Sequence, residues 1–351
     1  MKKIFTNIYN RIFFDILIFL CMRNYIFLLS YFMSILLNLS GDRIYFCTYK
    51  KKEVLVKYLN ILNKEKLNYD NMALSKEDNK ILSEIKSNGI SSNFNLNLKD
   101  DEIANVKKYF KKSDFYDSHT PLKKNKRENS QTPSGAYISF DNFTQLNCEV
   151  LLKCCLNDRI VNLAAKYLGS FPYLYGLNTF VTFPNSEGFT HTYHRDHDNI
   201  KWLVFFINWT DTFIDNGAFQ QLLYTHSPSP MFNKYFLNND RFKNFDDFVN
   251  KSLGYESEFI ENKEKDKDMK NLVFSSFGKA GSITVCDTFG LHRGTPVKNP
   301  RLVTWIRFGV RQGRHNLLDE NLNSRVSLDN DELLKIYHKS KNNKVLKYLL
   351  K

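Results

Sequence analysis

Short β-rich runs that follow one another behind residue 169 are the feature that most restricts how this chain can fold. Each run is rich in Val, Ile, Phe, Tyr, Trp and Thr, and turn residues such as Pro-Asn and Asn-Gly separate them. The runs lie at 173–183, 201–209, 218–225, 281–288 and 301–310. Strands at this spacing, preceded by helical sequence, favour antiparallel sheets backed by helices. We therefore predict a mainly β fold with flanking helices, in which two sheets form a barrel.

Helical spacing dominates the sequence before these runs. Apolar residues recur every three or four positions over 148–168, and Gly169 follows as a typical C-terminal stop, which predicts one helix. Residues 75–95 show similar spacing. Residues 111–135 are polar and poor in β-branched side chains, so we expect a long loop there, near a substrate opening. The stretch 227–270 interrupts the strands and is interpreted as an insertion or lid, part of a specificity wall.

The N-terminal region is strongly apolar, but charged residues interrupt it. Asp15 and Arg23 divide the stretch 12–40, and no uncharged piece reaches the ~20 residues of a membrane-spanning helix. An aspartate inside the apolar run also argues against a secretory signal peptide. Three alternatives stay open for this stretch: helices packed on the main domain, a hairpin on a membrane surface, or a true span. The predicted organisation is an apolar helical region 1–70, a main domain 71–320 with the insertion 227–270, and a basic C-terminal helix 321–351.

The charge and cysteine content restrict partners and location. Against 37 Asp and Glu, the chain carries 50 Lys and Arg, a formal net charge of +13 that would suit a polyanion. The excess lies in scattered patches and not in one stripe, so no nucleic-acid partner is expected. The six cysteines form no C-x-x-C pair, which indicates a reducing, cytoplasmic location. Residues 12–40 stay a candidate membrane-contact segment.

Two histidines, one aspartate and one arginine are candidates for a metal site. His194 and Asp196 form an H-x-D pair before the run 201–209, and alternate residues of an extended backbone share a face. H-x-D alone more often marks a solvated polar loop. Its weight rises because His292 lies in a turn between two later strands and Arg301 opens the second of them. Two histidines and a carboxylate form the facial triad of non-haem Fe(II) oxygenases, and an arginine can hold a dicarboxylate by two parallel hydrogen bonds.

Three stretches around these residues match a known family. They are "YHRDHDN", "WLVFFINWTDTFIDNGAFQQLLYTHS" and "GKAGSITVCDTFGLHRGTPVKNPRLVTWIRF". Through these stretches, the segment 159–310 resembles the phytanoyl-CoA dioxygenase family of Fe(II)/2-oxoglutarate-dependent oxygenases. The resemblance implies a double-stranded β-helix (jelly-roll, cupin-like) barrel.

The same resemblance implies roles for residues of the candidate site. His194, Asp196 and His292 would bind Fe(II), and Arg301 would bind the C5 carboxylate of the cosubstrate 2-oxoglutarate. The implied reaction uses O₂ to hydroxylate a C–H bond of a small-molecule, acyl, lipid or sugar-type metabolite, and gives succinate and CO₂.

Residues near the predicted ligands are weaker candidates. Gln220 and Gln221 follow an Asp-Asn-Gly turn, and alternation should turn one of them, for which we take Gln220, toward the substrate. Asn178 lies on the run 173–183 and is a second candidate substrate contact. His191 and His197 flank the H-x-D pair and are predicted to face away from the site or to line its rim.

Two alternative functions stay open. Arg307 shares a strand face with Arg301 and is a third candidate substrate contact, and this R-x₅-R spacing also occurs in nucleic-acid demethylases of the same superfamily. In those enzymes, however, a longer loop separates the distal histidine from the first arginine. The second alternative is a barrel without turnover that serves as a binding module.

Overall fold

The computed structural model of the chain describes most of the region between residues 73 and 310. The described residues are Tyr49, Lys52, Glu53, Val56, 73–117, 120–125, 137–170, 172–184, 191–197, 199–237, 242–252 and 271–310. The predictions for 12–40 and for the C-terminal helix 321–351 lie outside the described residues. Within the described part, no helix combines the length and the apolar character needed to cross a membrane.

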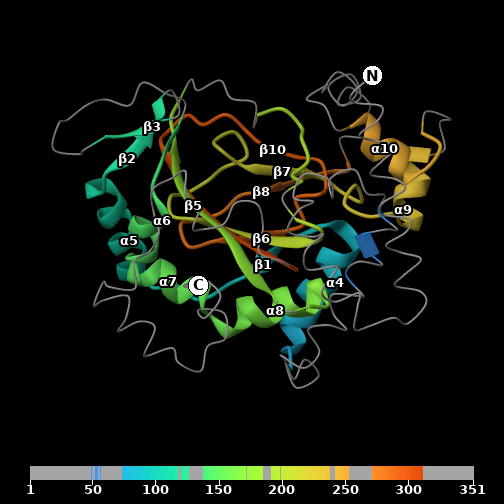
Figure 1. Ribbon diagram of the computed structural model, residues 1–351, viewed down its shortest axis with the longest axis horizontal. Coiled ribbons are helices and arrows are strands. Elements are labelled where there is room, and N and C mark those ends of the chain that lie inside the picture. The colour runs from blue at the N-terminus through green and yellow to red at the C-terminus, as the bar shows by residue number, and fades with distance from the viewer. Residues whose placement is uncertain are drawn as a thin grey trace, which may run out of the picture.

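Two antiparallel sheets form the centre of the protein (Figure 1). The larger sheet has the strand order β1(Ile90–Phe94), β9(Ile283–Cys286), β6(Trp202–Asn208), β11(Arg301–Gly309), β5(Tyr173–Thr182), β4(Tyr137–Ser139), β2(Phe115–Asp117), β3(Thr120–Asn125). The smaller sheet has the order β10(His292–Gly294), β7(Phe219–Leu222), β8(Val273–Ser276). All five predicted runs contain one of these strands, which confirms the mainly β fold with flanking helices.

A closed barrel is not found among the described residues, and the double-stranded β-helix barrel stays a prediction. The two sheets have separate hydrogen-bond ladders. The H-x-D segment adds only one bridge to the edge of the smaller sheet, between His194 and His292. It then leaves the ladder, because the Asp196 N–H donates to the Thr288 carbonyl in the loop before β10 (3.0 Å). Side-chain packing therefore joins the two sheets where a continuous ladder does not.

Strand β6 shows how the layers are built. Every residue of this strand is buried. Alternate side chains starting at Trp202 enter the layer between the sheets, where the Phe206 ring lies 4.8 Å from the ring of Phe219 on β7. Those starting at Leu203 enter the layer under the helices. A strand covered on both faces needs continuous apolar sequence, and "WLVFFIN" provides it.

Helices cover the outer face of the larger sheet, in the lower half of Figure 1. They are α4(Lys76–Asn88), α5(Asp100–Lys112), α6(Asn142–Leu146), α7(Glu149–Cys155) and α8(Asp158–Leu168). The single helix predicted over 148–168 is two helices, because the Asn157 side chain accepts the Arg159 N–H and begins a new helix. The predicted end at Gly169 is confirmed, since this residue has a left-handed backbone with φ 65°.

One segment departs from its prediction as a loop. The loop expected over 111–135 contains β2 and β3, which pair with each other, and β2 also pairs with β4. Backbone pairing at the edge of a sheet needs no apolar alternation, so polar sequence did not reveal these strands. The described part of the insertion contains α9(Pro230–Phe232), the π-helical turn η6(Asn233–Leu237) and α10(Phe245–Lys251). Five phenylalanines of this segment form an aromatic cluster: Phe232, Phe236, Phe242, Phe245 and Phe248.

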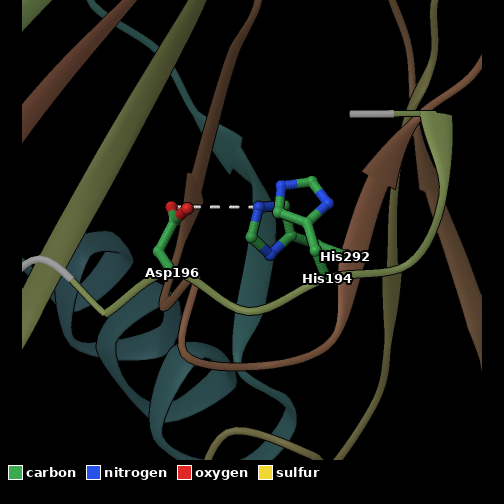
Figure 2. Close-up of side chains that lie close together, drawn as sticks. All are labelled: His194, Asp196 and His292. Atoms are coloured by element: carbon green, nitrogen blue, oxygen red, sulfur yellow. Dashed lines mark ion pairs between the residues drawn. The ribbon is translucent and has the colours of Figure 1, made fainter. Parts of the chain in front are cut away.

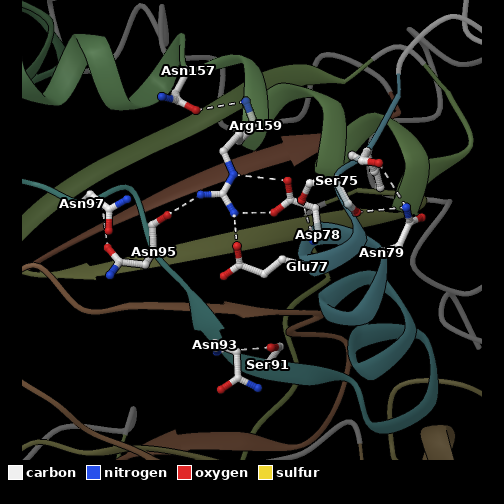
Figure 3. A network of polar contacts seen from close by, with 11 residues as sticks. Ser75, Glu77, Asp78, Asn79, Ser91, Asn93, Asn95, Asn97, Asn157 and Arg159 are labelled. Carbon is white, nitrogen blue, oxygen red and sulfur yellow. Dashed lines mark hydrogen bonds and ion pairs between the residues drawn. The ribbon is translucent and has the colours of Figure 1, made fainter.

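Arg159 connects α8 to α4 and to the chain that follows β1 (Figure 3). Its Nη2 and Nε atoms donate to both carboxylate oxygens of Asp78, at 2.6 and 3.2 Å. Its Nη1 donates to the Asn95 carbonyl at 2.7 Å, and its guanidinium lies over the ring of Phe94. The Glu77 carboxylate lies farther away, at 3.5 Å, and is mostly exposed. The buried Asp78 carboxylate is therefore the main anionic partner of Arg159.

Replacing Asp78 by Asn should destabilise the protein at neutral pH. Burial alone would raise the pKa of Asp78, but the hydrogen bonds and charge of Arg159, with Ser75, hold it below the usual value. Because the folded-state pKa is depressed, the stabilisation is present above the unfolded-state pKa of about 4 and is lost as the pH falls through the folded-state value. We expect Asp78→Asn to lower the free energy of unfolding by about 1.5–3 kcal/mol at pH 7. Urea unfolding at pH 7 and at pH 3 measures this, and the difference from wild type should shrink at pH 3.

Glu77→Gln is the matched control for this prediction. Glu77 is the neighbouring carboxylate, and it is exposed, so its loss should cost no more than about 0.5 kcal/mol. Equal destabilisation by both substitutions would contradict the assignment of Asp78 as the main partner.

Candidate metal centre

The backbone around the H-x-D pair fixes His194 and His292 side by side. The His194 N–H donates to the His292 carbonyl at 2.9 Å, and the His292 N–H donates to the His194 carbonyl at 3.0 Å. Asp196 is anchored separately, through the bond from its N–H to Thr288. His194 and Asp196 lie two positions apart in extended backbone, so their side chains share a face. The loop 288–292 thus positions two distant parts of the chain as one site.

The three side chains converge as the sequence predicts. Figure 2 shows the Asp196 carboxylate facing the imidazoles of His194 and His292. His292 Nε2 lies 3.8 Å from Asp196 Oδ2, and one ligand atom from each of the three residues lies within 4.8 Å of the others. Among the described residues this is the one group of His, Cys, Asp or Glu side chains with such a spacing. Two imidazoles and one carboxylate at these separations form a donor set for a divalent transition metal.

Both imidazoles are oriented by the same local contact. His194 Nδ1 lies 2.9 Å from the Thr192 carbonyl, and His292 Nδ1 lies 2.9 Å from the Gly290 carbonyl. A carbonyl can only accept a hydrogen bond, so each Nδ1 carries the proton. Each Nε2 then presents its lone pair to the shared space, which is the arrangement that metal-binding histidines use.

The electrostatics of the site keep Asp196 charged and His292 neutral. Burial would raise the pKa of Asp196, but the charges of Arg307, His292 and His194 outweigh it and lower the pKa to about 2. Burial, followed by the neighbouring His194, lowers the pKa of His292 to about 4. At neutral pH the pair therefore has the ionisation state that a metal cation needs, a carboxylate and a free imidazole lone pair.

Arg307 lies against the predicted ligand Asp196. Its Nη2 donates to Asp196 Oδ2 at 3.0 Å, and its guanidinium lies 4.1 Å from the centre of the Trp305 ring. A substrate contact was expected for Arg307, and this stays a prediction. The contact that the structure gives it is with a ligand, where it can hold one carboxylate oxygen and leave the other for a metal.

Arg301 is a buried cation without an acidic partner among the described residues. Its side chain is 7% exposed, and its Nε atom has no hydrogen-bond partner there. Burial lowers its pKa to about 10, so the guanidinium stays charged at neutral pH. Arg301 and Arg307 lie on the same face of β11, the face that also carries Val303 of the inter-sheet layer. A buried, unpartnered guanidinium is costly, and a carboxylate ligand would satisfy it.

The weaker candidates occupy different positions. Gln220 lies on the face of β7 opposite to His292, where its side chain contacts Ser275 and Arg293. Gln221 shares the His292 face but is buried, and it donates to the carbonyls of Gly89 and Asp287. The Gln220 substrate contact stays a prediction.

Asn178 and the flanking histidines complete the predicted set. Asn178 pairs with Trp305 and therefore shares the face of β11 that carries Arg301 and Arg307. His191 is half-buried, and burial, followed by the charge of Arg301, lowers its pKa. His197 is placed edge-on to the Phe289 ring. Neither histidine belongs to the converging group.

Two residues with clear roles escaped the sequence analysis. The Phe219 ring stacks on the His292 imidazole at 5.4 Å and 25°. Strand alternation could have placed Phe219 near the site, because Phe219 shares a strand face with Gln221, one of the two glutamines considered as substrate contacts. Arg195 is the second: it lies between the two ligands, and its buried side chain contacts three separate segments. No signal in the sequence indicates those contacts.

The chain is similar to several solved structures, while no family model and no curated protein sequence matches it. The epimerase SnoN, in complex with Fe3+, alpha ketoglutarate and nogalamycin RO, is 14% identical with a TM-score of 0.41, over 66% of this chain and 82% of SnoN. HygX from Streptomyces hygroscopicus, with nickel, 2-oxoglutarate and hygromycin B bound, is 10% identical with a TM-score of 0.42, over 67% and 87%. The non-heme alpha ketoglutarate dependent carbocyclase SnoK is 12% identical with a TM-score of 0.40, over 69% and 85%. TM-scores at this level do not establish a common fold, and the resemblance to the phytanoyl-CoA dioxygenase family stays a prediction.

Proposed function

We propose that this protein is an Fe(II)/2-oxoglutarate-dependent dioxygenase that hydroxylates a C–H bond of a small-molecule metabolite. The observation that carries the proposal is the convergence of His194, Asp196 and His292, with each imidazole oriented through its Nδ1 by a backbone carbonyl. The buried guanidinium of Arg301, which lacks an acidic partner in the described part of the chain, supports a dicarboxylate cosubstrate. The three converging ligands alone would fit many metalloproteins. Together with a buried arginine for a dicarboxylate, they favour the Fe(II)/2-oxoglutarate-dependent class.

Each residue has a defined task in this proposal. His194, Asp196 and His292 hold Fe(II), and Arg307 keeps Asp196 ionised and fixes its orientation. Arg301 binds the distal carboxylate of 2-oxoglutarate by charge-assisted hydrogen bonds. When bound, the iron would activate O₂ as the oxidant, and 2-oxoglutarate would supply two of the four electrons for O₂ reduction as it loses CO₂ to give succinate; the substrate C–H bond would supply the other two. Phe219 packs against one imidazole and keeps water from that side of the ligand set.

The described surroundings of the site suit a small substrate. The aromatic rings of Phe206, Phe219 and Trp305 belong to or pack against the layer between the sheets. Arg307, the residue that could suggest a nucleic-acid demethylase, is engaged with Asp196 and stacked on Trp305. A metabolite substrate, of acyl, lipid or sugar type, is therefore the class that we propose, with Asn178 and Gln220 as further candidate contacts.

Turnover of the cosubstrate tests the proposed function directly. Purified protein with Fe(II), O₂ and 2-oxoglutarate should form succinate slowly without substrate, and faster with an accepted metabolite from a screened mixture. Binding of both metal and 2-oxoglutarate without any succinate would support a binding module. Demethylation of a methylated oligonucleotide would support the nucleic-acid alternative, and absence of metal binding would refute the proposal.

Gly217 offers an independent test of the Arg301 assignment. Its φ is +74°, and a Cβ placed on it would lie 2.6 Å from Arg301 Cδ and 2.9 Å from Val297 Cγ1. Gly217→Ala should therefore displace the Arg301 side chain and weaken 2-oxoglutarate binding by up to on the order of 100-fold. Isothermal titration of 2-oxoglutarate into the metal-loaded protein measures the effect.

Gly281→Ala is the matched control. Gly281 has a φ of +89°, and its added Cβ would meet the flexible end of Ile103, which belongs to a helix on the outer face. Both substitutions should cost roughly 1–2 kcal/mol of stability, because both force alanine into a left-handed conformation. Only Gly217→Ala should change 2-oxoglutarate affinity, and an equal change in both variants would count against the placement of Arg301.

A further inference from the structure

Arg195, the middle residue of the H-x-D sequence, turns away from the ligand face and is buried behind it. Its side chain is 7% exposed. Nη1 donates to the carbonyls of Thr225, at 2.7 Å, and of Phe289. Nε donates to the Ser252 hydroxyl at 2.9 Å. The guanidinium thus joins three segments that are distant in the sequence.

The first of these segments is the loop that also carries His292. His194, Arg195 and Asp196 each bond to it: His194 through its backbone to His292, Arg195 through its side chain to Phe289, and Asp196 through its backbone to Thr288. Thr225 adds to this arrangement, because its hydroxyl accepts the Leu291 N–H at 2.9 Å. The position of His292 relative to the other two ligands therefore depends on a set of bonds to which the Arg195 side chain contributes.

The second segment is the insertion, whose helix α10 ends next to Arg195. Ser252, which accepts from Arg195, directly follows α10. The guanidinium lies 4.8 Å from the centre of the Phe248 ring and 5.3 Å from that of Phe289. Phe248 is fully buried in the aromatic cluster of the insertion, and Phe245 of the same cluster packs on Phe289. Through these contacts the insertion packs against the loop that carries His292.

We propose that Arg195 is a positioning residue that lets the described parts of the insertion, 230–237 and 242–252, hold the metal ligands in place. The inference rests on the proposed metal site. It gives the insertion a task different from substrate selection: the aromatic cluster fixes Phe248 and Ser252, these fix the Arg195 guanidinium, and Arg195 fixes the loop that carries His292. Loss of an outer partner that orients metal ligands typically costs on the order of 10–100-fold in metal affinity.

Metal titration of four variants tests this inference, with Co(II) alone as the probe and without 2-oxoglutarate. Arg195→Met should raise the Co(II) dissociation constant by on the order of 10–100-fold and change the visible Co(II) spectrum. Arg195→Lys keeps the charge but not the forked geometry and should recover part of the affinity. Ser252→Ala removes a single contact on the insertion and should give a smaller loss in the same direction. Arg159→Met removes another arginine that packs on a phenylalanine, and it should lower stability without changing Co(II) affinity.

The outcomes separate this inference from the proposed function. If the wild-type chain does not bind Co(II), the metal site itself is wrong. If it binds, and folded Arg195→Met binds with the same affinity and spectrum, the positioning role is wrong and the metal site stands. Thermal melting shows which variants are folded, and if Arg195→Met is not, unchanged Co(II) affinity in Ser252→Ala overturns the inference.

Discussion

His292→Ala should abolish metal binding at micromolar concentrations and, with it, succinate formation. The substitution removes one of the three donor groups and also the partner on which His194 and Asp196 converge. The loss should exceed the 10–100-fold that the loss of an outer partner typically causes, since a direct ligand is removed. Titration with Fe(II) under nitrogen and a succinate assay in air provide the two measurements.

His226→Ala is the control for a general effect of losing a buried histidine. His226 is 2% exposed and contacts the Lys86 carbonyl through Nε2, but it lies outside the converging group. Its replacement should lower stability and leave metal affinity unchanged. Metal affinity in His292→Ala within a few-fold of wild type would show that the described convergence is not a metal site.

Arg301→Met should weaken 2-oxoglutarate binding while leaving the unliganded protein as stable as wild type or more stable. The expected loss is that of removing one partner from a buried, hydrogen-bonded charge pair, about 2–5 kcal/mol, which corresponds to roughly 30- to 4,000-fold in affinity. The stability effect has the opposite sign, because the Arg301 Nε is buried without a partner in the described part of the chain. Replacing it by an apolar side chain should raise the free energy of unfolding by up to about 3 kcal/mol.

Two measurements decide the Arg301 prediction. Calorimetric titration of 2-oxoglutarate into nickel-loaded protein under nitrogen gives the affinity, and urea unfolding without ligand gives the stability. Arg301→Lys keeps the charge without the forked donors and should bind with intermediate affinity. Metal affinity should be unchanged in both variants. A variant that is strongly destabilised and still binds 2-oxoglutarate normally would mean that Arg301 is a structural residue.

The strands show which elements of the fold can be predicted from local sequence. The runs at 173–183 and 301–310 are continuous and β-rich, and they form β5 and β11 almost at the predicted bounds. Strand β10 was not predicted, because three residues around His292 carry no periodic pattern and become a strand only by pairing with β7. The same holds for β2 and β3, whose polar sequence suggested a loop.

The predicted ligands could be chosen from the sequence because strand alternation is a local property. H-x-D places two donors on one face wherever the backbone is extended, and Arg301 followed by Arg307 share a face for the same reason. Alternation shows that adjacent residues lie on opposite faces of a strand, but it does not show which face points to the site. Gln220 was therefore predicted, although Gln221 is the residue on the His292 face.

By itself, then, the sequence determined which residue types can meet at the site and which residues of one strand share a face, because both follow from backbone geometry over a few residues. Only the tertiary structure decided which partner each one has. Arg307 meets Asp196 across 111 positions, and Arg195 meets Phe289 across 94. Such contacts depend on the register between strands and on the packing of the inserted segment, and no pattern of neighbouring residues encodes them.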